Sequence, residues 1–228
     1  MPKPPVLAID LDGTLIETAP DLMGTLNVIL DREGLAPVSL QQVRGMVGQG
    51  AKIMLQRGFA AHGETLEGER LETLFEAFLE HYAEHIAVES HPFPGVVAAL
   101  EGFRAEGWKL AVCTNKLEAL TRRLLDELDL TRLFDAIGGP DTFGVRKPDP
   151  QHLIKTIDAA GGEATNAIMV GDSAADINAA KNASVPVVAV DFGYTDIPVS
   201  ELGPDRIISH FDELAGAVSE LRAAMTAG

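Results

Sequence analysis

The sequence predicts an α/β protein with a Rossmann-like parallel sheet and a helical domain inserted after the first strand. Two observations lead to this prediction. From residue 92 onward, short apolar runs alternate with segments of helical periodicity, which is typical of a parallel sheet with right-handed crossovers. Between residues 16 and 91, only helical periodicity is evident. We therefore divide the chain into an α/β core of residues 1–15 and 92–228 and a helical domain of residues 16–91.

The first strand is an apolar run at residues 6–9, and the helical patterns of the inserted domain follow it. In the first of these helices, Leu22, Leu26 and Ile29 lie on one face, and Gly34 is a typical helix end. The inserted helices are predicted at residues 19–33, 41–47, 51–61 and 66–85.

After residue 92, predicted helices alternate with predicted strands. Pro94 marks the first turn of a helix, Asp149 and Pro150 are a typical cap and first helical residue, and Asp212 is expected to cap the final helix. The predicted strands are residues 109–113, 136–138, 167–170, 187–190 and, more weakly, 206–209. The predicted helices are residues 94–106, 117–128 and 174–183, with two more beginning at 149 and 212.

The composition is that of an ordinary globular protein with an acidic balance. Of 228 residues, 46% are hydrophobic and 23% are charged, and the formal net charge is -16. Such a charge repels nucleic acid and anionic membrane surfaces, so we expect neither as a partner. An anionic substrate would have to be attracted locally, by a metal ion, a placed lysine or a helix N-terminus. No pattern indicates an oligomeric state.

The cysteine content and the N-terminal residues bear on the compartment. Cys113 is the single cysteine, which excludes an intrachain disulfide and fits a reducing environment. The first five residues lead directly into the predicted strand and lack the pattern of a signal peptide. We therefore expect a cytoplasmic protein with a buried, structural thiol.

Two carboxylates follow the first strand. Asp10 and Asp12 are one residue apart, and Gly13 permits a tight turn beside them. Because the carboxyl ends of the strands in an open α/β sheet form the ligand-binding edge, both side chains are expected there. Two like charges this close repel each other, and a bound cation is the simplest reason for keeping both.

Polar residues also follow later strands. Thr114 and Asn115 come directly after the second core strand and supply a hydroxyl and an amide for an anion. Lys147 precedes a proline, which restricts its backbone and directs its side chain. Asp172 and Asp176 follow a glycine at the start of a helix. Each of these is ordinary loop or capping chemistry when taken alone.

Together these residues predict a hard-cation site beside an anion site. Their strands end at one edge of one sheet, so the side chains would face a common crevice. Carboxylates, a lysine and hydrogen-bond donors suit phosphoryl transfer with Mg²⁺. The glycine-rich loops that bind nucleotide phosphates are absent from the sequence, so we do not expect the phosphate to belong to a nucleotide cofactor.

At these residues the sequence resembles the phosphatase branch of the haloacid dehalogenase superfamily. The four family motifs occur in order as residues 10–14, 114–115, 147–148 and 171–172 with Asp176. The inserted helical domain resembles the mobile cap of that family. Residues 47–50, 114–116 and 146–150 are most similar to the phosphoglycolate phosphatases. The resemblance implies Mg²⁺-dependent hydrolysis of a small phosphorylated metabolite, here 2-phosphoglycolate to glycolate and phosphate.

The resemblance also implies roles in catalysis and metal binding. Asp10 would be the nucleophile that forms an aspartyl-phosphate, and Asp12 would be the general acid and base. Lys147 would neutralise charge on the phosphate and on Asp10. Asp10, the backbone carbonyl of Asp12 and Asp172 would bind Mg²⁺, with Asp176 supporting them through the metal's waters.

Substrate binding is divided between core and cap by the same resemblance. Thr114, Asn115, Lys147 and the backbone N–H groups of Leu11 and Asp12 would hold the phosphoryl oxygens. In the cap, specificity is expected from Gly48, Gln49, Gly50 and Lys52: the glycines allow close backbone approach, and Lys52 could pair with a substrate carboxylate. Arg44 and Arg57 are weaker candidates for that pairing.

Several other functions fit the same fold. A dehalogenase or a phosphonate hydrolase has no need of Asp12, and this residue argues against both. A sugar phosphomutase and a pyrophosphate or sugar-phosphate phosphatase keep the same core residues and stay open. A non-catalytic phosphate-binding module would have no reason to keep a nucleophile, an acid, a lysine and metal ligands together. His81 and His85 have the i, i+4 spacing of metal ligands, but a solvated helix face is the preferred interpretation.

Overall fold

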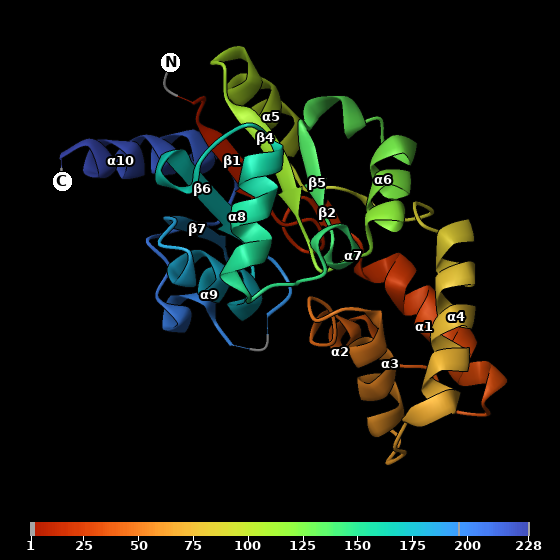
Figure 1. Ribbon diagram of the computed structural model, residues 1–228. Coiled ribbons are helices and arrows are strands. Elements are labelled where there is room, and N and C mark those ends of the chain that lie inside the picture. Colours follow the sequence, from red (N-terminus) through yellow and green to blue (C-terminus); the bar gives the residue numbers. More distant parts are fainter. Residues whose placement is uncertain (1–2, 196, 228) are drawn as a thin grey trace.

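A six-stranded parallel sheet forms the centre of the α/β body in the computed structural model, which describes residues 3–195 and 197–227 (Figure 1). The strand order is β5-β4-β1-β6-β7-β8, so β1 lies inside the sheet, where the strand order reverses. All five pairings are parallel. The strands are β1 (Val6–Ile9), β4 (Lys109–Cys113), β5 (Ala136–Gly138), β6 (Ala167–Gly171), β7 (Val187–Val190) and β8 (Arg206–Ile208).

The central strand β1 is buried on both faces, as its continuous apolar sequence predicts. Leu7 and Ile9 pack into one hydrophobic cluster, whereas Val6 and Ala8 pack into a second cluster on the other face. Ile9 pairs with Val112 of β4 and Val170 of β6. This register brings the residues that follow β1, β4 and β6 to one edge of the sheet.

Helices cover both faces of the sheet. On one face α8 (Pro150–Ala159) and α9 (Ala174–Asn182) pack against the central strands. The other face is covered by α5 (Val96–Ala105) and α10 (Leu214–Ala227), with α6 (Glu118–Glu127) beside β5. The short elements are α7 (Pro140–Phe143), η1 (Thr131–Leu133), η2 (Ala164–Asn166), η3 (Val199–Leu202) and η4 (Phe211–Glu213). None of the helices in the described ranges is both long and apolar enough to cross a membrane.

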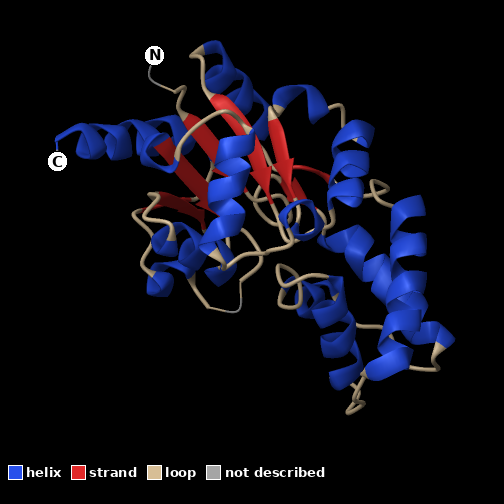
Figure 2. Ribbon diagram, viewed as in Figure 1, coloured by secondary structure: helices blue, strands red, loops and turns tan. Residues whose placement is uncertain are grey.

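The inserted segment forms a separate helical body beside the sheet's edge. Figure 2 shows the strands gathered in one body and helices and loops alone in the other. The helices are α1 (Ala19–Arg32), α2 (Leu40–Arg44), α3 (Ala51–Ala60) and α4 (Gly68–Glu84). Their apolar faces meet around Leu26, Phe59, Phe78 and Tyr82, which are all buried. The amphipathic patterns of residues 16–91 therefore correspond to a real helical core.

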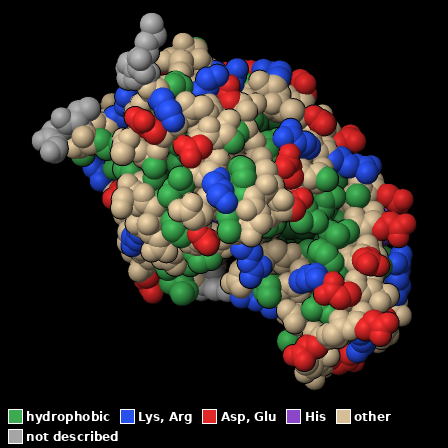
Figure 3. All heavy atoms as spheres, viewed as in Figure 1, with side chains coloured by type: hydrophobic (Ala, Val, Ile, Leu, Met, Phe, Trp, Pro, Cys, Tyr) green, Lys and Arg blue, Asp and Glu red, His purple; other side chains and the backbone are tan. Residues whose placement is uncertain are grey.

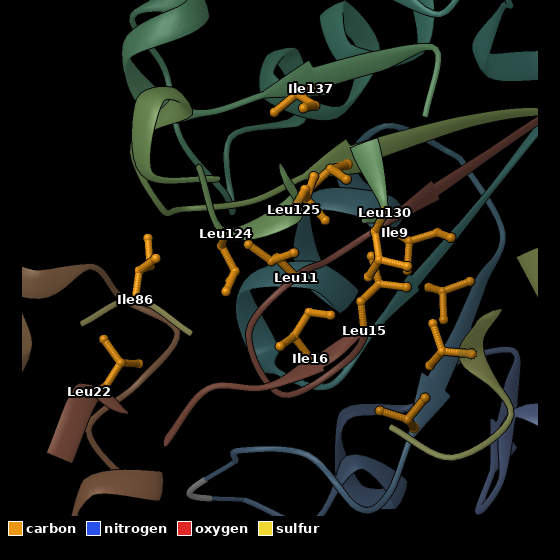
Figure 4. Close-up of a cluster of buried hydrophobic side chains, with 14 of the residues drawn as sticks. Ile9, Leu11, Leu15, Ile16, Leu22, Ile86, Leu124, Leu125, Leu130 and Ile137 are labelled. Atoms are coloured by element: carbon orange, nitrogen blue, oxygen red, sulfur yellow. The ribbon is translucent and has the colours of Figure 1, made fainter. Parts of the chain in front are cut away.

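Two short strands join the bodies, where the sequence predicts helices alone. The strand β2 (Ile16–Glu17) pairs antiparallel with β3 (His91–Pro92), and the pair stands at the two ends of the insertion. A strand of two residues has no detectable periodicity, which is why the pattern does not reveal it. Figure 4 shows Ile16 close to Leu11 and Leu15 of the core, with Leu22 and Ile86 of the helical body nearby.

Helix termini differ from expectation at three places. The helix expected from residue 94 begins at Val96 with Gly95 as its N-cap, so Pro94 lies before the helix and not in its first turn. The helix expected at residues 41–47 begins at Leu40, because Ser39 and Gln42 form a reciprocal cap: the Gln42 side chain accepts the Ser39 N–H at 2.9 Å. The expected cap at Asp212 is wrong. Asp212 lies inside η4, where its own N–H donates to Nδ1 of His210 at 3.2 Å. The cap at Asp149 is confirmed by its bond from the Gln151 N–H, 2.9 Å long.

Candidate active site

Three buried carboxylates meet at the carboxyl edge of the sheet. Asp10 follows β1, Asp172 follows β6, and Asp176 lies in the first turn of α9. Each offers an oxygen within 4.8 Å of an oxygen of the other two. The parallel register explains the meeting, because β1 and β6 are neighbours and end at the same level. Of the four acids that the sequence predicts for this edge, Asp10, Asp172 and Asp176 are therefore brought together, whereas the Asp12 side chain is not part of the cluster.

Lys147 neutralises part of this charge. Its ammonium lies 2.7 Å from Oδ1 of Asp10 and 2.5 Å from Oδ1 of Asp176, and its side chain is only 1% exposed. Burial opposes a charge on Lys147, but the carboxylates of Asp10 and Asp176 outweigh it and raise the pKa of the ammonium. The lysine therefore remains charged between the two acids.

The neighbouring residues hold Asp172 and Asp176 in place. The Thr14 hydroxyl and the backbone N–H of Tyr194 donate to the two oxygens of Asp172, at 3.2 and 2.5 Å. Ser173 donates its backbone N–H and its hydroxyl to Oδ2 of Asp176, at 3.0 and 2.6 Å. Asp176 is therefore engaged through both oxygens, by Ser173 and by Lys147. This engagement suits a supporting role better than direct metal coordination.

Gly13 makes the close approach of the loops possible. Its φ is +83°, and a Cβ atom there would lie 2.4 Å from Oδ2 of Asp172 and 2.8 Å from the Tyr194 ring. Any other residue would therefore displace the carboxylate and strain the backbone.

The donor set fits a hard divalent cation. Burial and the neighbouring Asp176 raise the pKa of Asp10 to about 7, although Lys147 opposes the shift. The pKa of Asp172 is raised for the same reasons, burial first and then Asp176 and Asp10. Both shifts reflect the repulsion among three buried carboxyl groups that share one ammonium, so full ionisation of the cluster needs a further positive charge. An all-oxygen set of this kind could hold a divalent metal ion, which would favour the ionised carboxylates.

The Asp12 side chain lies apart from this cluster, next to Thr18 at the start of the helical body. Its Oδ1 accepts from the Lys116 ammonium at 2.7 Å and from the Thr18 hydroxyl at 2.7 Å. The sequence indicates Lys116 only as part of a motif and does not identify its partner. The one sequence feature that points to Lys116 as a site residue is its position directly after Asn115, beyond the end of β4.

Asn115 holds the active-site loops together. Its side-chain oxygen accepts the Lys147 N–H at 2.9 Å, and its side-chain nitrogen donates to the carbonyls of Lys147 at 3.2 Å and Gly48 at 3.1 Å. It therefore fixes the backbone that carries the lysine and contacts the helical body. The neighbouring Thr114 is buried, and its Oγ accepts the Lys116 N–H at 3.1 Å, which leaves its own proton available for an anion.

A cavity of about 200 Å³ lies above these residues, between the two bodies. Figure 3 shows hydrophobic side chains gathered in the hollow between them. Asp10, Asp12 and Thr114 form part of its polar floor. Residues 48–50 and Lys52, from which the sequence analysis expects specificity, line it from the helical body. Its apolar walls include Leu22, Val47, Met54, Phe75, Phe78 and Leu79.

The three cationic candidates of the helical body have other partners. Lys52 pairs with Glu72 at 2.6 Å and its ammonium lies 4.8 Å from the Phe75 ring centroid. Arg44 pairs with Glu17 at 2.6 Å, and Arg57 donates to the carbonyl of Gly45 at 2.6 Å. Of these, Lys52 alone lines the cavity among the described residues. The rings of His81 and His85 stack at 4.2 Å, and Nδ1 of His81 lies 3.2 Å from the Thr25 hydroxyl.

Comparisons with known proteins agree with this geometry. Curated relatives include a phosphoglycolate phosphatase of Mesorhizobium japonicum, 49% identical over 216 residues that cover 95% of each chain. Another is a phosphoglycolate phosphatase of Agrobacterium fabrum, 47% identical over 219 residues, which cover 96% of this chain and 94% of the relative. A solved structure described as a predicted phosphoglycolate phosphatase from Haemophilus somnus superposes with a TM-score of 0.88 at 29% identity, covering 94% of this chain and 98% of that one.

The family is shown by a second comparison. The model of the haloacid dehalogenase-like hydrolase family matches residues 7–190, which include β1, the helical body, β4 and β6. The match thus contains Asp10, Lys147 and Asp172. Because this match covers most of the chain and the relatives are nearly half identical to it, the chain belongs to the haloacid dehalogenase-like hydrolase family.

Proposed function

We propose that this hydrolase is a Mg²⁺-dependent phosphatase that converts 2-phosphoglycolate to glycolate and phosphate through an aspartyl-phosphate. The observation that carries the proposal is the buried pairing of Asp10 with Lys147, 2.7 Å apart, beside the carboxylates of Asp172 and Asp176. The substrate is suggested by relatives named phosphoglycolate phosphatase that share up to 49% of their residues with this chain.

Asp10 begins the reaction as the nucleophile. A carboxylate oxygen of Asp10 attacks phosphorus, the bond from phosphorus to the bridging oxygen breaks, and its electron pair stays on that oxygen. Asp12 protonates the departing oxygen, and glycolate leaves. Asp12 then takes a proton from water as the water oxygen attacks phosphorus, which releases phosphate and restores the Asp10 carboxylate.

The remaining residues bind and neutralise charge. Lys147 is close enough to Asp10 to offset charge on both the carboxylate and the phosphoryl group. Thr114 and the backbone N–H groups of Leu11 and Asp12 would hold phosphoryl oxygens. The Asn115 side chain, expected from the sequence to share this role, is instead engaged by Lys147 and Gly48 and would position the lysine loop. Mg²⁺, held by Asp10, the Asp12 carbonyl and Asp172 with Asp176 in support, would supply the remaining charge neutralisation.

The helical body would act as a cap that closes over the bound ester and excludes water. It lines one side of the cavity, and the pair β2 and β3 connects it to the core through two chain segments. Gly48, Gln49, Gly50 and Lys52 would then border the leaving group.

Phosphate release from a panel of esters tests this proposal. The panel is 2-phosphoglycolate, 3-phosphoglycerate, glucose 1-phosphate and pyrophosphate, each with and without Mg²⁺. We expect metal-dependent release with a clear preference for 2-phosphoglycolate. A single turnover with phosphorus-labelled substrate, quenched in acid, should leave label on the protein but not on the Asp10→Asn variant. Preference for another ester would overturn the substrate, and transfer of phosphate back to a sugar would indicate a mutase.

A further inference from the structure

The proposed substrate sets a geometric requirement on its binding site. In 2-phosphoglycolate a single carbon separates the bridging oxygen from the carboxylate. If Asp12 protonates the bridging oxygen, a group that binds the carboxylate must lie next to Asp12. This inference rests on the proposed function, because it uses both the substrate and the role of Asp12.

Lys116 meets the requirement. It lines the cavity, and its ammonium lies 2.7 Å from Oδ1 of Asp12. Its side chain is only 7% exposed, so the charge has little contact with solvent. An ammonium has three N–H donors; Asp12 accepts one and the Tyr82 oxygen can accept a second, which leaves one donor for a ligand.

Tyr82 supplies a second observation at the same place. It extends from α4 of the helical body, and its ring centroid lies 4.7 Å from the Lys116 ammonium. The side chain is buried and lines the cavity, and its hydroxyl oxygen is close enough to accept from the Lys116 ammonium. The hydroxyl proton has no acceptor in the part of the chain that the structure describes. A buried hydroxyl proton without an acceptor is costly, and a carboxylate in the cavity would accept it.

Other cations are placed less well for this task. Lys52 lines the cavity but is 41% exposed and is bound to Glu72, while Arg146 is exposed and donates to the Gln49 carbonyl at 3.4 Å. Lys147 is already shared between Asp10 and Asp176. Lys116 is therefore the cavity cation that contacts Asp12 among the described residues.

We propose that the Lys116 ammonium and the Tyr82 hydroxyl together bind the carboxylate of the leaving group and make the enzyme select short phosphate esters that carry one. Lys116 comes from the core and Tyr82 from the helical body. A carboxylate held by both would therefore connect the two bodies.

A comparison of two substrates tests this proposal. Ethyl phosphate lacks the carboxylate, and the ratio of kcat/KM for 2-phosphoglycolate to kcat/KM for ethyl phosphate measures its contribution. We expect Lys116→Met to lower this ratio about 100-fold and Tyr82→Phe about tenfold, because each removes a hydrogen bond to a charged group. Lys116→Arg, which keeps the charge, should retain part of the preference. The ratio separates carboxylate binding from any general effect of an unpaired Asp12 on turnover.

Binding without turnover gives an independent readout. In the Asp10→Asn background, calorimetry should show that Lys116→Met weakens 2-phosphoglycolate and leaves ethyl phosphate nearly unchanged. Lys155→Met, at an exposed position of α8, is the matched control and should alter neither. Circular dichroism checks that each variant is folded, and Tyr82→Phe provides a milder test if Lys116→Met is not.

The possible results distinguish this inference from the proposed function. An equal loss for both esters in Lys116→Met would show that Lys116 only positions Asp12, and would overturn the inference. A preference that survives in Lys116→Met but disappears in Lys52→Met would assign the carboxylate to Lys52 instead. If the unmodified enzyme does not prefer 2-phosphoglycolate to ethyl phosphate, the substrate assignment fails and the carboxylate site fails with it.

Discussion

The hydroxyl of Tyr194 donates to the carboxylate of Glu17, and this bond ties the loop after β7 to the strand β2. The same hydroxyl accepts the backbone N–H groups of Thr18 at 2.8 Å and Ala19 at 3.0 Å, where α1 begins. The backbone N–H of Tyr194 donates to Asp172 at 2.5 Å. One residue of the core thus contacts both a candidate metal ligand and the start of the helical body.

Replacing Tyr194 by Phe is expected to lower the free energy of unfolding by about 2–3 kcal/mol, because buried N–H groups of Thr18 and Ala19 lose their acceptor. Urea denaturation measures the change. Thr195→Val is a suitable control: among the described residues its hydroxyl bonds the exposed Ile197, two positions away, so a loss below about 1 kcal/mol is expected. Equal stability of Tyr194→Phe and the unmodified protein would refute the structural role.

Removal of divalent metal should lower the melting temperature, and Asp172→Asn should abolish that response. Mg²⁺ at about 100 times its dissociation constant stabilises a folded protein by about 2.7 kcal/mol. Without metal, Asp172→Asn should melt higher than the unmodified protein, because it relieves the repulsion from Asp176 and Asp10 that raises the pKa of Asp172. Thermal unfolding with Mg²⁺ or with chelator gives both results. A metal-dependent shift that persists in the variant would place the ion elsewhere.

The core residues of the site could be predicted from the sequence because parallel strands end at one edge of a sheet. Asp10, Thr114 and Asp172 each follow a strand, and the observed register brings them together. Each follows a short apolar run that predicts a strand, and the residues become informative when they are taken together. Lys147 does not follow a strand, and the proline after it is what indicates a directed side chain.

The contacts that join the two bodies could not be predicted in this way. Tyr194 and Glu17 are 177 residues apart and neither lies in a periodic segment. The strands β2 and β3 have two residues each, too few for an alternating pattern. Tyr82 lies on the apolar face of α4, but an apolar pattern does not reveal that this side chain lines the cavity.

The Cys113 thiol is expected to resist modification in the folded protein. It is fully buried in the sheet, and burial raises its pKa to about 12, although the charge of Lys147 opposes the shift. Ellman's reagent should therefore release no colour under native conditions and one equivalent in urea. Cys113→Ser should release none in either condition. A fast reaction of the native protein would contradict the burial of this residue.

His152 should make stability depend on pH. Burial and then the charge of Lys147 lower the pKa of His152 from 6.5 to about 4. Between these values the unfolded chain binds a proton that the folded protein does not, so stability falls as the pH falls. Between the two pKa values the free energy of unfolding changes by about 1.4 kcal/mol for each pH unit. From about pH 7.5 to about pH 4.5 the protein should therefore lose about 3 kcal/mol of unfolding free energy.

The variant His152→Gln isolates this contribution. The imidazole Nε2 lies 3.1 Å from the carbonyl of Gly138, and a Gln amide can donate to the same oxygen without titrating. Urea denaturation at several pH values should therefore show a smaller loss for the variant. Parallel curves for the two proteins would mean that His152 does not contribute.

Gly48→Ala tests whether the loop before α3 must hold its present shape. Gly48 has φ +97°, and a Cβ atom there would meet nothing within 4 Å, so the substitution strains the backbone without a clash. Its carbonyl accepts from Asn115 at 3.1 Å, and Asn115 holds the backbone of Lys147. Relaxation of the strained loop would move the Gly48 carbonyl away from Asn115 and break their hydrogen bond. We therefore expect kcat/KM for 2-phosphoglycolate to fall about tenfold, equivalent to about 1.4 kcal/mol.

Gly63→Ala supplies a control of matched strain. Gly63 has φ +76°, and a Cβ atom there would likewise meet nothing within 4 Å, but this glycine lies in the turn between α3 and α4, away from the cavity lining. Both variants should lose about 1–2 kcal/mol of stability, since both force an L-residue into the left-handed region. Only Gly48→Ala should lose activity as well. Equal kcat/KM values for the two variants would mean that strain in this loop does not reach Asn115, and that the glycine serves the turn alone.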